Sequence, residues 1–465
     1  MPLYARAAAR YMPRCWDGMA GLADRRFFSF LEMGEAARPV LMSLDGASDF
    51  ESFAFTRDQR ALLREMIRQG YAEACAPGDP LSPFQRPKRA ESPYLREVHW
   101  AITGRCNLGC RHCFMESPSG RYPEPSWAEL EHTVGQFARA NVAFVSLTGG
   151  EPLVHPEIRR LVALLSEEGI PINQIATNGT LLDASFMELL RDMGQTPAFQ
   201  ISFDGVGRHD RMRGVEDAEK AALHAIELCV SEGFFTAVTS IFNRENIDSL
   251  LQSYERLKAI GVSTWMISRA QSAGLWHGGP EALTTEEMGQ SLLELQKRWL
   301  EDGKPMHMLL ESYFEARPEG APPARKRAGF SPESMECPET RERIFLLPDG
   351  SLLPCPGFAG TSVAGHMPNL RDWALTDALK DSPLPHFCRE KKSARLKKNP
   401  QCDACGHFAE CGMGCRAYAL TEGGSLDGPD PGACAMYKDG WKRRFAEAER
   451  RFIEERVRHG EYSPR

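Results

Sequence analysis

Three cysteines occupy one stretch of eight residues, CNLGCRHC, at Cys106, Cys110 and Cys113. A disulfide framework is one interpretation, but disulfides do not persist in a reducing compartment. A zinc site is another, but zinc needs four ligands and usually takes its cysteines in pairs. An iron–sulfur cluster held by three thiolates would leave one iron without a protein ligand. Such an open iron could bind a substrate or a cofactor.

A glycine-rich turn, TGGEP at 148–152, suggests what fills that position. Gly149 and Gly150 would let the backbone approach a ligand closely. The Glu151 carboxylate could accept hydrogen bonds from an ammonium group. The amino and carboxylate groups of an amino acid would chelate an open iron in a five-membered ring. We therefore expect the turn to hold the amino group of such a ligand.

The pattern of residues 96–310 predicts the elements that position these turns. Strands are predicted at 97–103, 143–148, 172–177, 198–203, 235–242 and 263–268, and helices at 126–140, 155–169, 182–194, 215–232, 246–260 and 284–302. The last helix opens with a capping-box signal, Thr284-x-x-Glu287. Alternating strands and helices imply an α/β fold with a parallel sheet, here a partial (β/α)6 TIM-like barrel. In such folds the chemistry lies at the carboxyl ends of the strands, and Cys106 follows the first of them.

Residues 1–95 are predicted to form a separate domain with a strand, two helices and a final strand. The first helix is expected to end at Gly46, and the second to run from Thr56 to Gly70. A Pro-rich spacer follows at 76–93. This order of elements is compatible with a winged-helix module.

The end of the chain differs in composition. Residues 311–336 are rich in Pro, Ala and charged residues, which predicts a linker. Residues 337–465 are rich in Gly and Cys and show little periodicity, so we expect metal sites to stabilise them. The basic run KKSARLKK at 391–398 is interpreted as a solvated face. A final amphipathic helix is predicted to carry Trp441, Phe445, Ala448 and Phe452 on one side.

Charge and hydropathy limit the class of protein. The net charge of −7 argues against a general nucleic-acid binder. No apolar run approaches the ~18 residues typical of a membrane span. The N-terminus lacks the apolar core of a signal peptide, although its basic, Ala-rich character leaves a transit peptide open. We expect a cytoplasmic protein with no nucleic-acid or membrane partner.

Together, the cysteine triplet and the TGGEP turn resemble the radical S-adenosylmethionine (SAM) superfamily. The resemblance covers about 96–303 and implies that SAM chelates the open iron of a [4Fe–4S] cluster. It further implies that an electron, supplied by a reductant such as flavodoxin or ferredoxin, splits SAM and releases a 5′-deoxyadenosyl radical. That radical abstracts hydrogen from an unactivated carbon. A non-enzymatic cluster protein would not need the glycine-rich turn.

The resemblance also implies roles for single residues. The cluster ligands would be Cys106, Cys110 and Cys113, and the methionine amino group would meet Gly149, Gly150 and Glu151. His112 would pack on the adenine rather than act as a base. Ser202 would contact the ribose or the carboxylate, unless it only caps the following turn. Arg213 would pair with the carboxylate, and no general base is assigned.

Eight of the 14 cysteines lie in the last 130 residues, which favours metal binding over disulfides. Seven of them fit the spacing of the SPASM extension, which occurs on radical enzymes that modify peptides and proteins. The resemblance implies one auxiliary [4Fe–4S] cluster on Cys402, Cys405, Cys411 and Cys434, and a second on Cys337, Cys355 and Cys415. The second lacks an obvious fourth thiolate, and Cys388 is a candidate, although we interpret it as a thiol outside any cluster. A zinc site in CDACGHFAECGMGC is the main alternative, but it leaves Cys337, Cys355 and Cys434 unexplained.

These resemblances predict a peptide maturase. Its substrate would be a precursor peptide whose leader binds the N-terminal domain as an added strand, unless that domain only packs against the barrel. The product would be an intrapeptide C–C or C–S cross-link. One alternative is a formylglycine maturase of the sulfatase type, in which an Asp base follows the Gly-x4-Cys cysteine; here Pro356 follows Cys355. Another is a radical dehydrogenase or epimerase that acts on a small molecule or a peptide.

Overall fold

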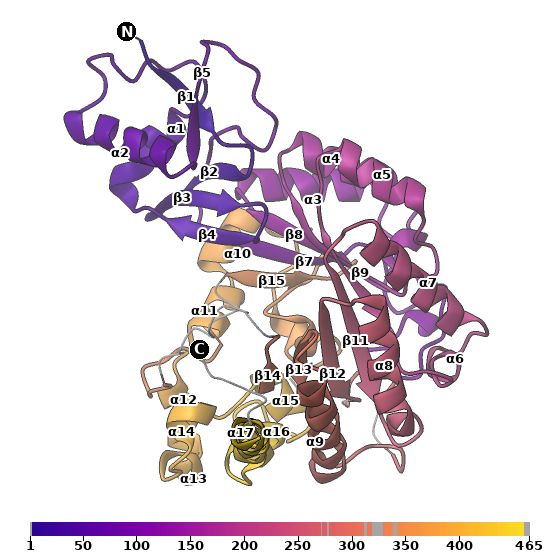
Figure 1. Ribbon diagram of the computed structural model, residues 1–465. Coiled ribbons are helices and arrows are strands. Elements are labelled where there is room, and N and C mark those ends of the chain that lie inside the picture. Colours follow the sequence, from indigo (N-terminus) through magenta and orange to yellow (C-terminus); the bar gives the residue numbers. More distant parts are fainter. Residues whose placement is uncertain are drawn as a thin grey trace.

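The computed structural model describes residues 2–270, 272–276, 279–310, 314–318, 329–337 and 342–459. A long sheet with helices along it forms the middle of the molecule (Figure 1). A β-rich N-terminal module lies at one end of this sheet, and in Figure 1 the C-terminal helices lie below it. The sheet, which contains the strands of the predicted catalytic part, therefore lies between the N-terminal module and the C-terminal helices.

The central sheet has ten strands in the order β14-β13-β12-β11-β10-β9-β8-β7-β15-β16. The six predicted strands are all present and parallel, as β7 (Glu97–Ala101), β8 (Phe144–Thr148), β9 (Ile172–Thr177), β10 (Ala198–Ser202), β11 (Thr236–Phe242) and β12 (Thr264–Arg269). The six predicted helices are present as α3 (Trp127–Arg139), α4 (Ile158–Glu167), α5 (Ala184–Asp192), α7 (Ala218–Ser231), α8 (Leu250–Ile260) and α9 (Thr285–Glu301). The capping box at the start of α9 is confirmed, since the Thr284 hydroxyl accepts the Glu287 N–H.

The sheet is longer than the six strands predicted. β13 (His307–Leu310) lies parallel to β12, and β14 (Phe314–Ala316), which falls within the predicted linker 311–336, pairs with β13. At the other end β15 (Arg343–Leu346) lies parallel to β7 and pairs with β16 (Leu352–Leu353). These strands are too short to show a period in the sequence. An ion pair of 2.8 Å between Arg343 and Glu97 fixes β15 beside β7.

Side chains of β7 alternate between the two faces of the sheet. Trp100 packs edge-to-face on Phe137 of α3, with 5.1 Å between ring centroids. His99 contacts Phe345 of β15 on the other face, at 5.4 Å. The first face carries the helices and the main hydrophobic core, whereas the second lines the interior where a ligand can bind.

The N-terminal module contains more strands than predicted. Its elements are β1 (Tyr4–Ala7), β2 (Tyr11–Trp16), β3 (Met19–Asp24), β4 (Ser29–Glu32), α1 (Arg38–Met42), α2 (Arg57–Arg68), β5 (Ala72–Cys75) and β6 (Lys88–Arg89). The helix from Thr56 and the strand that follows it are confirmed. The first helix is only five residues long and ends before Gly46. Strands β4-β3-β2-β6 form a sheet with β4 at an edge.

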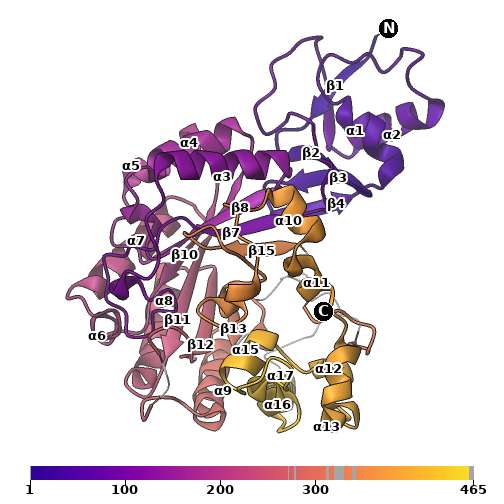
Figure 2. The same ribbon diagram turned by 180° about the vertical axis from the view of Figure 1, so that it is seen from behind.

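Three buried contacts fasten this module to the α/β region around the central sheet. The Trp16 indole donates to the Ala140 carbonyl at 3.2 Å, and Arg14 donates to the Gly169 carbonyl at 3.0 Å. The Asn141 amide donates to the Cys15 carbonyl at 3.1 Å. Figure 2 shows α3 and α4 on the side of the sheet next to β2, β3 and β4. The module is therefore part of one packed structure with the α/β region.

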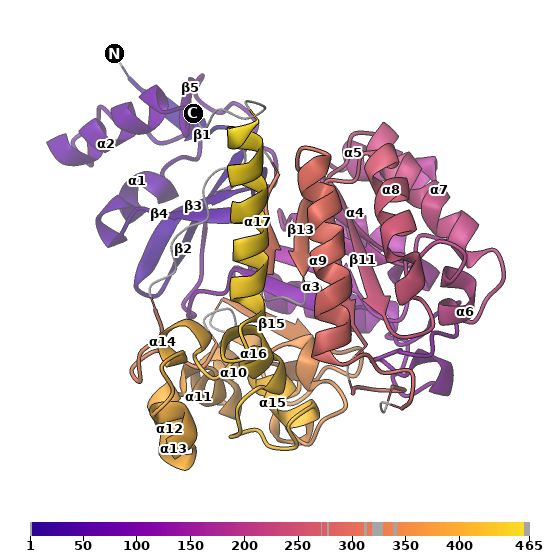
Figure 3. The same ribbon diagram turned by 60° about the horizontal axis from the view of Figure 1, so that its bottom comes forward.

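The C-terminal region is built from short helices and one long one. They are α10 (Leu375–Asp381), α11 (Pro383–Arg389), α12 (Lys392–Lys398), α13 (Pro400–Asp403), α14 (Phe408–Cys411), α15 (Arg416–Thr421), α16 (Pro431–Tyr437) and α17 (Trp441–Arg458). The predicted amphipathic helix is α17, which lies beside α9 (Figure 3). Trp441 and Phe445 are buried there. No helix among the described residues has the length and apolar character needed to cross a bilayer.

The basic run 391–398 is not the solvated face that we predicted. Lys392 and Arg395 on α12 are buried, at 1% and 0% exposure. Arg395 forms an ion pair of 2.7 Å with Glu336, and Lys392 donates to the Gly412 carbonyl at 2.6 Å. Buried cations need such partners, and these partners come from distant segments that the local sequence does not reveal.

Candidate active site

A cavity of about 440 Å³ lies at the carboxyl ends of the parallel strands. It brings together eight of the predicted site residues, namely Cys106, Cys110, Cys113, His112, Gly149, Gly150, Ser202 and Arg213. Pro356, Gly357 and Tyr418 of the C-terminal region complete its wall. The site is therefore formed by the α/β region and the Cys-rich region together.

The three cysteines of the triplet follow β7 in one loop and pack around Leu108. Each sulfur accepts a hydrogen bond: Cys106 from the Leu108 N–H at 3.4 Å, Cys110 from Arg213 at 3.5 Å and Cys113 from the Ser117 N–H at 3.5 Å. Burial raises the pKa of Cys106 to about 12, so a thiolate there needs a compensating cation. One buried and two partly buried thiols, each with an N–H donor, fit a cluster held by three thiolates.

The glycines of the TGGEP turn allow two loops to touch. Gly149 has φ +144°, and a Cβ there would lie 2.5 Å from the Thr103 carbonyl oxygen. A Cβ on Gly150 would lie 2.2 Å from the Arg105 carbonyl oxygen. The Gly150 N–H donates to Thr103 at 2.9 Å, so the turn is fastened to the loop that carries the triplet. Any larger residue would separate the glycine turn from the cysteines.

Glu151 does not line the cavity, although we predicted that it would meet the amino group of a ligand. Its side chain is completely buried. Its carboxylate accepts from the Thr177 hydroxyl at 2.8 Å, the Asn178 N–H at 2.7 Å and the Leu153 N–H at 3.0 Å. Burial nevertheless raises its pKa to about 7. In this structure Glu151 joins the turns after β8 and β9, and contact with a ligand stays a prediction.

A buried network that we did not predict lies around Asp204, from the SFDG turn after β10. Asp204 is completely buried and forms an ion pair of 2.7 Å with Arg213. His112 Nε2 lies 3.7 Å from the same carboxylate. Burial lowers the pKa of His112 to about 4, so its ring is neutral near pH 7, as packing on a ligand requires.

The predicted roles of Arg213 and Ser202 are not decided by this geometry. Arg213 already pairs with Asp204 and donates to Cys110, so it holds the triplet as well as facing the cavity. The Ser202 hydroxyl has no hydrogen-bond partner among the described residues and lies at the cavity wall.

Asn178 was also missed; it lines the cavity, and its amide lies 3.9 Å from the Cys106 sulfur. The TNGT and SFDG turns at the strand ends were the signal for Asn178 and Asp204.

The comparisons with known proteins agree with this geometry. Residues 100–257 match the Radical SAM superfamily. The chain is a radical SAM enzyme. Mycofactocin maturase MftC of Mycolicibacterium smegmatis is 28% identical over 359 residues, which cover 76% of this chain and 84% of the relative. An AdoMet-dependent heme synthase of Oleidesulfovibrio alaskensis is 24% identical over 363 residues, or 73% and 87% of the two chains.

Solved structures support the same fold over more of the chain. The structure of Streptococcus suis SuiB bound to precursor peptide SuiA has a TM-score of 0.65 and 15% identity. It covers 92% of this chain and 99% of that chain. The radical SAM enzyme described here is therefore related to peptide maturases of the SPASM type.

The C-terminal cysteines of this radical SAM enzyme fall into two groups. The pKa of Cys411 is raised to about 11, chiefly by burial, with smaller contributions from the thiols of Cys434 and Cys402. Burial also raises the pKa of Cys355, with additional effects of Cys415 and Cys337. Such mutual effects require that the thiols within each group lie near one another. Their assignment to two auxiliary clusters stays a prediction.

A mononuclear zinc site would need its ligands around one ion. Among the described residues, no three His, Cys, Asp or Glu side chains lie close enough to hold a single metal ion. The thiolates of a four-iron cluster bind separate irons at the corners of a larger core. The choice between clusters and zinc at these cysteines therefore stays a prediction.

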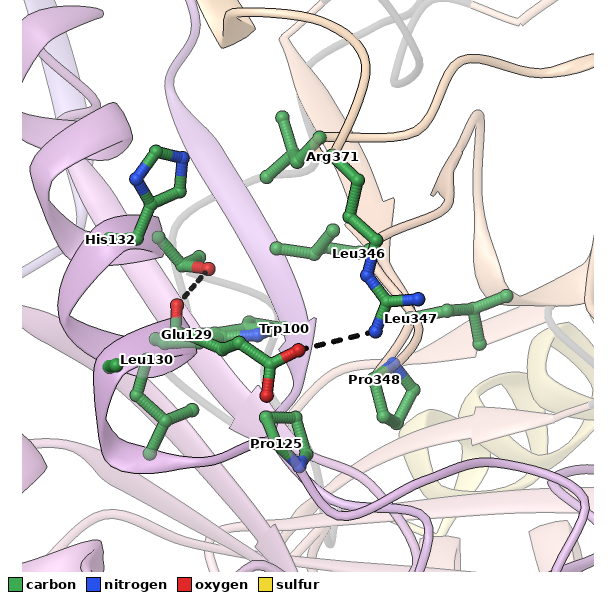
Figure 4. A pocket seen from close by; sticks show the side chains of 13 residues that line it. Trp100, Pro125, Glu129, Leu130, His132, Leu346, Leu347, Pro348 and Arg371 are labelled. Atoms are coloured by element: carbon green, nitrogen blue, oxygen red, sulfur yellow. Dashed lines mark hydrogen bonds and ion pairs between the residues drawn. The ribbon is translucent and has the colours of Figure 1, made fainter.

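A second cavity, of about 350 Å³, lies on the helix side of the sheet (Figure 4). Trp100, His132 and Leu346 line it, and an ion pair of 3.2 Å joins Arg371 to Glu129 of α3. None of the triplet cysteines reaches this cavity. We assign the chemistry to the first cavity and not to this one.

Proposed function

We propose that this radical SAM enzyme is a SPASM-type maturase that modifies a precursor peptide, with an intrapeptide cross-link as the product. The observation that carries this proposal is the single cavity in which the triplet, the glycine turn and the Cys-rich region meet. When bound, the cluster and SAM would supply a 5′-deoxyadenosyl radical. The protein would bind and orient both and shield the radical from water.

The chain's own residues suit these tasks. The thiols of Cys106, Cys110 and Cys113 would bind the cluster, and the backbone of Gly149 and Gly150 would face SAM. Asp204 fixes Arg213 beside Cys110 at the cavity wall. Tyr418 on α15 and Gly357 form the wall of the cavity on the C-terminal side.

The N-terminal module supports a peptide substrate. Its edge strand β4 is exposed at Leu31 and Glu32. The Met33 N–H donates to the Ala20 carbonyl at 2.9 Å. Because antiparallel strands alternate their donors, the N–H groups of Phe30 and Glu32 point away from β3. We infer that a leader peptide pairs with this edge as an added strand.

The function is tested with the peptides encoded by short reading frames next to the gene. The anaerobically reconstituted enzyme is incubated with SAM, dithionite and each full-length peptide, and the products are analysed by mass spectrometry. A cross-link predicts that the peptide loses two hydrogen atoms while 5′-deoxyadenosine forms. Formation of haem from a tetrapyrrole, with every peptide unchanged, would instead favour the activity named for the heme synthase relative.

A further inference from the structure

We propose that Cys388 is the fourth thiolate of the auxiliary cluster on Cys337, Cys355 and Cys415, so that this cluster has no open iron. The inference rests on the proposed function, because it assumes that the C-terminal region holds clusters. It reverses the interpretation of Cys388 as a thiol outside any cluster. Three separate contacts of α11 and the residues after it carry the inference.

The first contact joins Cys388 to the segment of Cys355. Cys388 lies in the last turn of α11 and is buried, with 5% exposure. The ring of its neighbour Phe387 meets the Phe358 ring edge-on, with 5.3 Å between centroids. The Phe358 N–H in turn donates to the Cys355 carbonyl at 3.2 Å. The end of α11 is thereby fixed against the turn that begins at Cys355.

The second contact joins the same end of α11 to Cys415. Arg416, the next residue after Cys415, places its guanidinium 4.3 Å from the centre of the Phe387 ring. Its Nη1 also forms an ion pair of 2.6 Å with Glu390. Arg416 is buried, and this ion pair fixes the residue after Cys415 beside the end of α11.

The third contact joins the segment after α11 to Cys337. The N–H of Glu336, next to Cys337, donates to the Glu390 carbonyl at 2.9 Å. Met335 and Lys391 form a bridge of the antiparallel type beside it. The short segment from Phe387 to Lys391 therefore touches an immediate neighbour of Cys337 and of Cys415, and the turn of Cys355.

The electrostatics of the thiols agree with these contacts. The thiols of Cys415, Cys337 and Cys388 each lie close enough to Cys355 to act on it electrostatically. A four-iron cluster binds each thiolate at a different iron.

A closed cluster at this place has a consequence for the substrate. A Cβ on Gly357 would lie 3.6 Å from the Cys355 sulfur, and Gly357 itself lines the cavity of the triplet. The cluster would thus border the cavity. With Cys388 as a ligand, a cysteine of the substrate peptide has no vacant iron to bind there, and this cluster is available for electron transfer only.

The test measures the cluster and not the turnover. Cys106, Cys110 and Cys113 are first replaced by Ala, so that only auxiliary clusters remain, and Cys388→Ala is then added. The matched control adds Cys229→Ala instead, which removes a completely buried thiol from α7. Iron content, electron paramagnetic resonance and binding of added β-mercaptoethanol are compared after anaerobic reconstitution. Cys388→Ser, which keeps the size of the side chain, is measured as well, in case the Ala variant does not fold.

We expect about eight irons in the parent and in the control. In the Cys388 variants we expect loss of about one iron or more, with a three-iron signal or a newly bound thiol at one cluster. Folded Cys388 variants with the iron content and spectrum of the control would overturn the inference. A parent without clusters would overturn the assignment of auxiliary clusters itself, so the two failures are distinguishable.

Discussion

Arg213 lies between Asp204 and Cys110: its Nε forms an ion pair of 2.7 Å with the Asp204 carboxylate, and its Nη1 lies 3.5 Å from the Cys110 sulfur. One guanidinium thus links the turn after β10 to the cysteine loop after β7. Asp204 is completely buried and its other oxygen accepts the Ile241 N–H at 2.9 Å. This arrangement fixes the position of Cys110, a predicted cluster ligand, from the far side of the cavity.

Asp204→Asn tests that arrangement, because Asn can still accept from Ile241 but carries no charge. We expect the free energy of unfolding to fall by about 3 kcal/mol, since the buried Arg213 loses its partner. Formation of 5′-deoxyadenosine should fall more than the iron content of the first cluster. The control, Asp248→Asn, removes the exposed partner of Arg208 and should change stability by less than about 1 kcal/mol. Equal effects of the two substitutions would contradict the role of Asp204.

Much of this site could be predicted because its turns follow long, regular elements. The six strands and helices of the barrel have enough residues to show their period, and the motifs stand at their ends. Asp204 was within the SFDG turn. Its burial and its pairing with Arg213 depend on the short helix that follows this turn and ends at Arg213, nine residues after Asp204. The contact of Glu151 with Thr177 and Asn178 likewise joins two separate turns, which no local pattern shows.

The N-terminal hairpin was missed although the sequence contains a signal for it. Asp17 and Gly18 form the two-residue turn between β2 and β3, and Gly18 has φ +74°. An Asp-Gly pair between two strands is typical of a hairpin. The flanking strands, YMPRCW and MAGLAD, are poor in β-branched residues, so their composition did not indicate strands.

The raised pKa of Glu151 predicts a pH dependence. Burial raises this pKa from 4.5 to about 7, so the folded protein binds the proton more tightly than the unfolded chain. The stability that this provides is complete below about pH 4.5 and is lost as the pH rises through 7. The difference in unfolding free energy between the wild type and Glu151→Gln should therefore fall by up to about 3 kcal/mol from pH 5 to pH 8. Anaerobic urea unfolding of the reconstituted proteins without SAM measures it, and a constant difference would contradict the burial argument.

Leader recognition is tested at β4 rather than by deletion, because removing the module would expose the barrel surface that Trp16 covers. Glu32→Pro removes one outward N–H from the edge and leaves the inward bonds to β3. We expect binding of the full-length precursor to weaken about fivefold or more, since one hydrogen bond contributes about 1 kcal/mol. Glu32→Val keeps the N–H and is the control. Cleavage of SAM without peptide should be the same in both, and equal peptide affinity would contradict strand addition at this edge.

The metal content separates the cluster assignment from the zinc alternative. Ten assigned thiols with Cys388 predict three four-iron clusters, or about twelve irons per chain after anaerobic reconstitution. Iron, sulfide and zinc are measured together on the same sample. About four irons with stoichiometric zinc would show that the C-terminal cysteines hold zinc instead.

The central claim is that the triplet starts radical chemistry on a peptide. The most direct measurement compares the wild type with the variant in which Cys106, Cys110 and Cys113 are all Ala, each reconstituted and supplied with SAM, dithionite and the precursor peptide. The wild type should form 5′-deoxyadenosine together with a peptide that lacks two hydrogen atoms, and the variant should form neither while it retains its auxiliary clusters. Undiminished 5′-deoxyadenosine from the variant would contradict the account.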